Sequence, residues 1–466
     1  MDQWLTLMQI AALAVTGMSH ALLGSIKVPL ARKLQIDETR VGGLVSVFGF
    51  TLIPMVIVAG FLVDSVGKQL VLGGGFVLLM LSLVILATVK TYRQAFLAVL
   101  VLGTGWSALV NVLNVTSPPA FVPAEELPQR MAYAMNMGDF IFGMGAFIMP
   151  ILVTVLMRRI GFKAALLSIA TLGIIPLLLG LGVDWDALVP ATTETVADGL
   201  KILLANPIVW ICCAAFFCHV PVEAAVATWA TTLMTDKGVS EGRAAGLLSV
   251  FWLSFMGSRL VAALALLGSF SLLGFKRTWD IPESTDAVLV LSMAGSCVLV
   301  TLGIVRSRTA NTMCVMVVLA GLILGPIFPT LIAILLKNVD ASLHGRAVGI
   351  FFCIGGIGWT VIPMMIGAYA QRTTVQRGFV IATASATLLT LLSALLWFQL
   401  QKPRDQKEPG NHPASVSSRG ALHHSSSSSL AGSCPHPSGM RLSSENDWNT
   451  LSIFSHCVVG TVGRGA

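Results

Sequence analysis

Charged residues are scarce in this sequence: they make up 11% of its 466 residues, whereas 55% are hydrophobic. An ordinary soluble domain carries about 25% charged residues, so a water-soluble globular fold is excluded. The apolar residues recur in runs of about the 20 residues that a helix needs to cross the hydrocarbon core of a bilayer. Because these runs lack the alternating period of barrel strands, we predict an all-α membrane protein.

Common motifs of catalysis and of cofactor binding are also missing. The sequence has no C-x-x-C pair, no phosphate-cradling G-x-x-x-x-G-K-[ST] loop and no plausible Ser-His-Asp set outside its C-terminal region. The Lys and Arg residues, which give a formal net charge of +7, lie singly or in pairs at segment ends rather than in one patch. We therefore expect no enzymatic activity, no cofactor, no metal site and no nucleic-acid partner.

Charged and Pro-rich breaks divide the apolar sequence into twelve predicted spans. They lie near 5–30, 41–63, 70–89, 94–115, 131–156, 163–183, 207–234, 243–268, 286–305, 311–336, 344–370 and 376–399. We predict an N-terminal six-helix half (1–183), a central cytoplasmic linker (184–206), a C-terminal six-helix half (207–400) and a disordered polar tail (401–466).

Internal repetition indicates that the two halves are related. The segment G-L-V-S-V-F at 43–48 reappears 203 residues later as G-L-L-S-V-F at 246–251. A G-x-G-x-x-x-x-P pattern at 143–150 reappears 213 residues later at 356–363. Two matches in the same order predict two pseudo-symmetric halves, and the seam between such halves can hold a midplane site that opens to each side by rocking.

The segment 60–68, G-F-L-V-D-S-V-G-K, resembles the loop signature G-x-L-a-D-r-x-G-r-k of the major facilitator superfamily. Lys68 stands where Arg is usual, and Ser65 and Gln69 replace further basic residues, so the charge network of this loop should be weaker here. The signature positions that we assign to a conformational loop motif are Gly60, Asp64, Gly67 and Lys68.

Shorter segments resemble the fucose permease and sugar symporter branch of that family: 217–223 with Trp229 in the seventh span, 257–259 in the eighth, and 325–330 in the tenth. The resemblance implies secondary transport by a multi-pass cell-membrane protein, which we expect to be monomeric. It also implies that both termini and the 64–68 loop are cytoplasmic. The positive-inside count opposes this orientation, because the loops placed outside hold more Lys and Arg.

Two ionisable residues inside the spans are the leading candidates for coupling transport to an ion. An offset of 203 residues relates His20 in the first span to Glu223 in the seventh, so we expect both to face a central cavity. The resemblance implies a proton-linked carboxylate in the first span, but 5–30 contains no Asp or Glu. His20 is a substitute, since its ordinary pKa is about 6.5. Alternatively, His20 is a packing residue and Glu223 a structural partner of a cation or backbone group.

Asp139 in the fifth span and Arg259 in the eighth are predicted to face each other across the seam as a gating or coupling ion pair. Alternatively, Arg259 extends toward the inner headgroups. Asn111 and Asn114 lie three residues apart on one helix face, and with Trp229, Trp252 and Trp359 they suit sugar hydroxyls and ring faces. Interhelical hydrogen bonding and packing are the alternative for these side chains.

The sequence therefore predicts a secondary active transporter of a small polar solute, most simply a sugar or polyol. It would work by alternating access in the lipid bilayer with a proton or sodium as coupling ion. One alternative is an exporter of drugs or metabolites on the same fold. A second, of another class, is a membrane sensor or receptor that does not transport.

Overall fold

The computed structural model describes residues 2–188, 196–272, 275–278, 281–282 and 284–401. Nearly all of them lie in helices, and they belong to one compact unit, Met1–Arg404. The predicted tail beyond Gln401 and residues 189–195 of the predicted linker lie outside the described residues.

The helices reproduce the predicted spans. Those of the first half are α1 (Gln3–Leu34), α2 (Glu38–Ser65), α3 (Lys68–Thr88), α4 (Tyr92–Phe121), α5 (Leu127–Thr171) and α6 (Ile174–Gly180). Those of the second half are α8 (Pro207–Thr235), α9 (Glu241–Leu266), α10 (Thr285–Arg306), α11 (Ala310–Leu324), α12 (Ile327–Lys337), α13 (His344–Ala370) and α14 (Val375–Gln401).

Eleven stretches of the described residues are long and apolar enough to cross a membrane. One of them, Ala124–Gly180, has 57 residues, more than twice the length that a single crossing needs. Its backbone is broken at Gly161, where φ is 78°, a left-handed value that favours glycine. This break lies between the predicted fifth and sixth spans, so the described residues hold twelve candidate crossings, and the predicted membrane fold is confirmed.

Polar side chains at the span boundaries start several of these helices. Asp2 accepts a hydrogen bond from the Trp4 amide at 2.9 Å, and Asp37 accepts one from the Arg40 amide at 2.7 Å. Before α4, the residue Thr91 forms a reciprocal capping box with the third residue of the helix. These caps satisfy backbone N–H groups that have no partner within the helix.

Short elements connect the spans: η1 (Ala124–Glu126), η2 (Asp186–Leu188), α7 (Val196–Ala205) and η3 (Ala341–Leu343). Strand β1 (Ser269–Leu272) pairs antiparallel with β2 (Phe275–Thr278) between α9 and α10. This short hairpin lies in one connection outside the spans, and the spans themselves are all helical, as the all-α membrane prediction requires. The predicted linker also carries secondary structure, since it contains η2 and α7.

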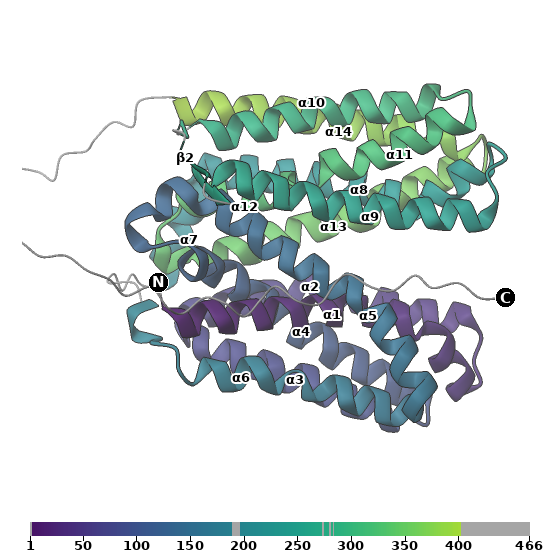
Figure 1. Ribbon diagram of the computed structural model, residues 1–466, viewed down its shortest axis with the longest axis horizontal. Coiled ribbons are helices and arrows are strands. Elements are labelled where there is room, and N and C mark those ends of the chain that lie inside the picture. Colours follow the sequence, from purple (N-terminus) through teal and green to yellow (C-terminus); the bar gives the residue numbers. More distant parts are fainter. Residues whose placement is uncertain (1, 189–195, 273–274, 279–280, 283, 402–466) are drawn as a thin grey trace, which may run out of the picture. The chain divides into compact units, whose positions relative to one another are not determined.

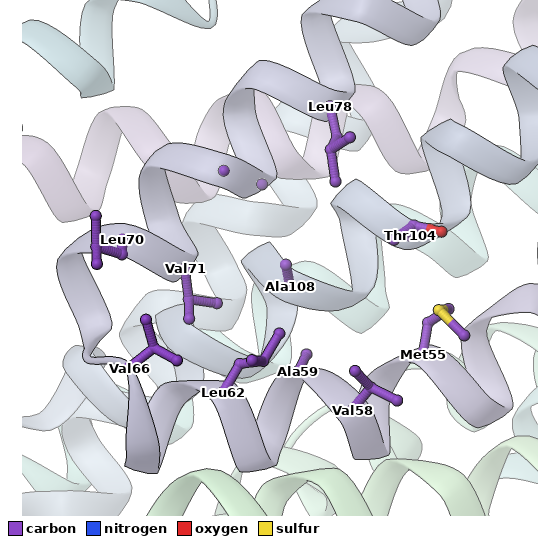
Figure 2. Close-up of a pocket in the computed structure, with 12 residues that line it drawn as sticks. Met55, Val58, Ala59, Leu62, Val66, Leu70, Val71, Leu78, Thr104 and Ala108 are labelled. Carbon is purple, nitrogen blue, oxygen red and sulfur yellow. The ribbon is translucent and has the colours of Figure 1, made fainter.

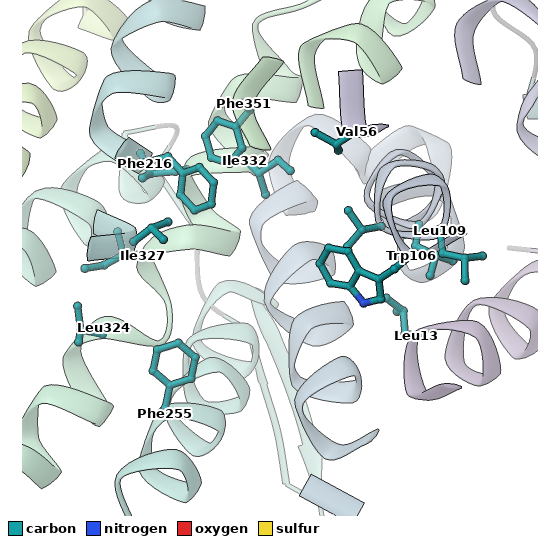
Figure 3. Close-up of a cluster of buried hydrophobic side chains, with 14 of the residues drawn as sticks. Leu13, Val56, Trp106, Leu109, Phe216, Phe255, Leu324, Ile327, Ile332 and Phe351 are labelled. Atoms are coloured by element: carbon teal, nitrogen blue, oxygen red, sulfur yellow. The ribbon is translucent and has the colours of Figure 1, made fainter. Parts of the chain in front are cut away.

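Helices α1–α6 gather in one group and α8–α14 in another, with α2 and α5 at the boundary (Figure 1). Across that boundary α2 packs against α13 and α5 packs against α9. Buried aromatic side chains fill the second group, where the rings of Phe216 and Phe351 stack 4.2 Å apart (Figure 3). We call the end of the bundle that carries the 64–68 connection the loop end.

Candidate functional site

Four titratable or charged side chains gather where the two groups of helices meet. Asp139 comes from α5, His219 and Glu223 from α8, and Arg259 from α9, and we call them the charged cluster. The Arg259 Nη2 lies 3.7 Å from the Asp139 Oδ2 across the boundary, and the Arg259 Nη1 donates a 3.4 Å hydrogen bond to the Asp139 carbonyl. The guanidinium is buried and faces Asp139, so it does not extend to the headgroups.

Proline chemistry explains how Arg259 is held. Its Nε donates a 3.0 Å hydrogen bond to the carbonyl oxygen of Gly325, between α11 and α12. That carbonyl would normally accept from the residue four positions later, but Pro329 has no N–H to give. Arg259 therefore satisfies a carbonyl freed within the membrane, and its guanidinium also lies 4.4 Å from the centroid of the Phe255 ring.

His219 and Glu223 are one helical turn apart on α8. The His219 Nε2 lies 3.6 Å from the Glu223 Oε2, and the His219 side chain is 0% exposed whereas that of Glu223 is 14% exposed. Neither ring nitrogen of His219 has a hydrogen-bond partner among the residues that the structure describes. Arg259 acts electrostatically on both residues, and Asp139 also acts on Glu223. With neutral His219, an ionised Glu223 leaves the charged cluster with an excess negative charge.

His20 lies in a separate group, among three aromatic rings of the N-terminal helices. Its ring centroid is 5.2 Å from that of Trp106, 5.8 Å from Phe142 and 6.4 Å from Phe48. The His20 side chain is nevertheless exposed, and the buried Trp106 Nε1 finds no hydrogen-bond partner in the described part of the chain. The structure thus gives His20 an open side and an aromatic setting, which we call the His20 box.

At the loop end, Asp64 joins α2 to the start of α13. Its two carboxylate oxygens accept hydrogen bonds from the backbone amides of Gly345 at 2.8 Å and Arg346 at 2.9 Å. The Arg346 Nε lies 3.5 Å from the same carboxylate, whose side chain is 4% exposed. An acidic group at a helix N-terminus is stabilised by the helix dipole. We call Gly60, Asp64, Gly345 and Arg346 the loop-end clamp.

The structure explains why glycine is needed at two positions of the loop motif. A Cβ on Gly60 would lie 2.3 Å from the carbonyl oxygen of Gly345, so only glycine lets α2 and α13 approach this closely. Gly67 has φ 103°, in the left-handed region. Lys68 donates a 2.6 Å hydrogen bond to the Leu188 carbonyl, which ties the 64–68 connection to η2.

The two asparagines do not line an open surface. Asn111 is fully buried and donates to the carbonyls of Val56 at 3.3 Å and Gly345 at 3.1 Å. Asn114 donates at 2.7 Å to Val110, within its own helix. This geometry supports the alternative of hydrogen bonding between and within helices, and a contact of the pair with a sugar stays a prediction.

The three tryptophans lie on three different helices, α8, α9 and α13. Trp229 is partly buried, and its ring lies 3.2 Å from where a Cβ on Gly367 would be. Trp252 packs edge-on against Phe255, with ring centroids 5.6 Å apart, and Trp359 is 44% exposed on α13. The structure therefore brings Asp139 and Arg259 together, and Trp252 packs on Phe255, the ring that the Arg259 guanidinium also approaches.

Sequence reasoning missed three polar residues of the boundary. His219 lies four residues before Glu223, a spacing that puts both on one helix face and was visible in the sequence. Asn136 of α5 donates a 3.1 Å hydrogen bond to Thr330 of α12, which also joins the two groups. Apart from its place in the 325–330 segment, Thr330 carries no signal that would single it out.

Comparisons with known proteins agree with this architecture. The family model described as the Major Facilitator Superfamily matches residues 10–275 and 284–453. The E. coli fucose:proton symporter FucP superposes with a TM-score of 0.68 at 14% identity, covering 84% of this chain and 99% of that one. The human organic anion transporter TETRAN gives a TM-score of 0.66 at 13% identity, covering 85% of this chain and 100% of that one. These likenesses show a shared fold.

A match by sequence is to the "Bypass of stop codon protein 6" of Saccharomyces cerevisiae (strain ATCC 204508 / S288c). It is 23% identical over 184 residues, which cover 39% of this chain and only 35% of the yeast protein. The family model covers most of the sequence, and the helices, the 60–68 motif and the boundary between two six-span groups fit it. The chain therefore belongs to the major facilitator superfamily and is a multi-pass membrane transporter by family.

Proposed function

We propose that this chain is a proton-coupled secondary transporter of a small polar solute, with a sugar or polyol as the leading substrate class. It works by alternating access, with the loop end and both termini in the cytoplasm. The observation that carries the proposal is that Arg259 lies 3.7 Å from Asp139 across the boundary and also attracts the carboxylate of Glu223 in its own half electrostatically.

Competition for Arg259 supplies a way to couple a proton to movement. When Glu223 is ionised, it attracts the guanidinium and weakens the attraction between Arg259 and Asp139. When Glu223 takes up a proton, its competition ends and the ion pair across the boundary is strengthened. Proton binding at one residue therefore changes the contact between the halves, and such a change in relative free energy is what shifts a conformational equilibrium.

The chemistry of the charged cluster favours a proton over sodium. Hard cations in proteins take oxygen ligands, whereas the groups around Glu223 include the imidazole of His219 and the guanidinium of Arg259. A guanidinium repels a metal cation. A carboxylate beside an imidazole, in contrast, is a common arrangement for proton relay within membranes.

The sugar assignment rests on two supports. One is the shared fold with a protein named as a fucose:proton symporter. The other is the His20 box, whose exposed imidazole can hydrogen-bond a hydroxyl while the neighbouring rings of Trp106 and Phe142 can pack on the apolar face of a sugar ring.

The test is uptake of a panel of labelled sugars and polyols into proteoliposomes under an imposed proton or sodium gradient. We expect accumulation of one solute driven by the proton gradient and lost in Glu223→Gln. His20→Ala should raise KM for the solute while coupling persists. The matched control is Glu241→Gln, a carboxylate exposed at the start of α9, which should transport normally. Accumulation driven by sodium alone would contradict the proton assignment.

A second candidate is an exporter of amphipathic metabolites, favoured by the burial of Asn111 and Asn114 and by the aromatic character of the His20 box. Vesicles loaded with a fluorescent amphipathic compound would show proton-dependent efflux in that case. If the folded protein transports none of these solutes in either direction, a non-transporting sensor becomes the better interpretation.

A further inference from the structure

An apolar groove runs along the N-terminal group of helices, between α2, α3 and α4 (Figure 2). Its volume is about 210 Å³. The residues that line it and carry this argument are Met55, Val58, Leu62, Val66, Leu70 and Gly74. Leu62 is 43%, Val66 50% and Leu70 65% exposed, so the groove is open along one side.

The groove exists because two glycines and two small residues stand where larger side chains would fill it. Gly74 and Gly75 line it from α3, and Thr104 and Ala108 line it from α4. A Cβ on Gly74 would meet nothing within 4 Å. The Thr104 hydroxyl donates a 2.9 Å hydrogen bond to the Leu100 carbonyl, so its donor is already used within α4.

We propose that one acyl chain of a bilayer phospholipid occupies this groove. The open side belongs to spans that cross the membrane, so hydrocarbon is what surrounds it. Apolar walls next to an unfilled gap lose dispersion contacts. A flexible hydrocarbon chain restores them without leaving a polar group unsatisfied, which a sugar or an ion in the groove would do.

The groove lies on the side of α2 that faces away from the loop-end clamp. Met55, Val58, Leu62 and Val66 follow one another at three- or four-residue spacing and form one stripe of the helix. Gly60 and Asp64, which contact Gly345, lie on the opposite stripe, since successive residues turn by about 100°. A chain bound in the groove therefore supports α2 from behind in the position in which it meets α13.

The experiment uses the full-length protein in nanodiscs that contain phosphatidylcholine with a photoactivatable diazirine near the end of one acyl chain. Cross-linked residues are then identified by mass spectrometry. We expect labelling at Leu62, Val66 and Leu70 to exceed several-fold the labelling at Val77 and Leu81, which are also exposed on α3 but do not line the groove. Equal labelling of both sets would overturn the proposal.

A matched pair of variants sharpens the test. Gly74→Leu fills the groove and should reduce labelling there several-fold, whereas Gly73→Leu, at a neighbouring position that is also open but outside the groove, should leave it unchanged. If Gly74→Leu does not fold, Ala108→Leu fills the groove from α4. Unchanged labelling in a folded groove-filling variant would show that the lipid does not sit there. None of these outcomes depends on the transported solute.

Discussion

Two of the contacts that join the halves, the loop-end clamp and the charged cluster, differ in how tightly they are made. In the loop-end clamp, Asp64 accepts two short backbone hydrogen bonds, at 2.8 and 2.9 Å, from the first turn of α13. In the charged cluster, Arg259 and Asp139 are 3.7 Å apart, and His219 and Glu223 are 3.6 Å apart. Charge-assisted hydrogen bonds are normally shorter than these separations. The clamp is a fixed joint, whereas the cluster leaves its charges room to change partners.

This difference indicates that the loop-end clamp and the charged cluster have different roles. A fixed carboxylate whose oxygens are both bonded to backbone amides is suited to holding one conformation. Loosely paired groups respond to one proton or one solute molecule, because a small change in charge decides which partner Arg259 prefers. The following predictions test whether the two contacts really differ, beginning with the largest expected effect.

Removal of Arg259 should have the largest effect on stability. Arg259→Ala leaves Asp139 and Glu223 inside the bundle without their cation and leaves the Gly325 carbonyl without its donor. Breaking a buried ion pair typically costs about 3–5 kcal/mol, so we expect a loss of about 4 kcal/mol. Unfolding of the purified protein in detergent would measure it.

The control is Arg243→Ala, an exposed arginine of the same helix, which should change stability little. The double variant Arg259→Ala with Asp139→Asn should recover part of the loss, because one uncompensated charge is then removed. Equal stability of parent and Arg259→Ala would show that the cluster does not hold the halves together.

Adding a side chain at the closest point of the clamp should separate α2 from α13. Gly60→Ala places a Cβ 2.3 Å from the Gly345 oxygen, and overpacking of this kind costs about 3 kcal/mol at the upper end of its usual range. We expect the distance between spin labels at Ser65 and Ala341, both exposed, to lengthen. Gly49→Ala, on the same helix with open space around it, should leave that distance unchanged.

Loss of the Asp64 charge should loosen the clamp without a steric clash. Asp64→Asn keeps the size of the side chain, but its amide group faces the Gly345 or Arg346 N–H with a donor instead of an acceptor. Hydrogen bonds to charged groups contribute about 2 kcal/mol, which corresponds to a more than tenfold shift in the conformational equilibrium. The same spin labels measure the shift, and an unchanged distribution would argue against the clamp.

Sequence alone predicted the spans well because their signal is simple. Long apolar runs interrupted by charge have one structural solution in a bilayer, and the break near Gly161 fell where two runs meet. The seam argument, in which corresponding helices of two repeats meet, also led to the juxtaposition of Asp139 and Arg259, which the structure shows as a contact. Its role in gating or coupling stays a prediction.

The rotation of each helix was much harder to predict. In a soluble protein the polar face of a helix reveals which side is exposed, but a membrane helix is apolar on its lipid face and its packed face alike. Two residues three positions apart, such as Asn111 and Asn114, were therefore assigned to one face without knowledge of what that face meets. His20 and Glu223 were paired by an offset of 203 residues; the structure gives them different neighbours, Trp106 for His20 and His219 for Glu223, and their facing one cavity stays a prediction.

The smallest expected effect comes from Asn111, which links α4 to α13 but contains no carboxylate and is part of neither the loop-end clamp nor the charged cluster. Asn111→Ala removes the hydrogen bond to the Gly345 carbonyl, and hydrogen bonds within membranes contribute about 0.6 kcal/mol on average. We expect the ratio of the two conformations that the spin labels report to change by about two- to threefold. Asn114→Ala is the control, since its amide donates to the Val110 carbonyl within its own helix. A larger effect of Asn114→Ala than of Asn111→Ala would contradict this assignment. Loss of solute affinity in either variant, with an unchanged spin-label distance, would instead show that the amide contacts the solute, because a residue that contacts only protein would change the distance between the halves.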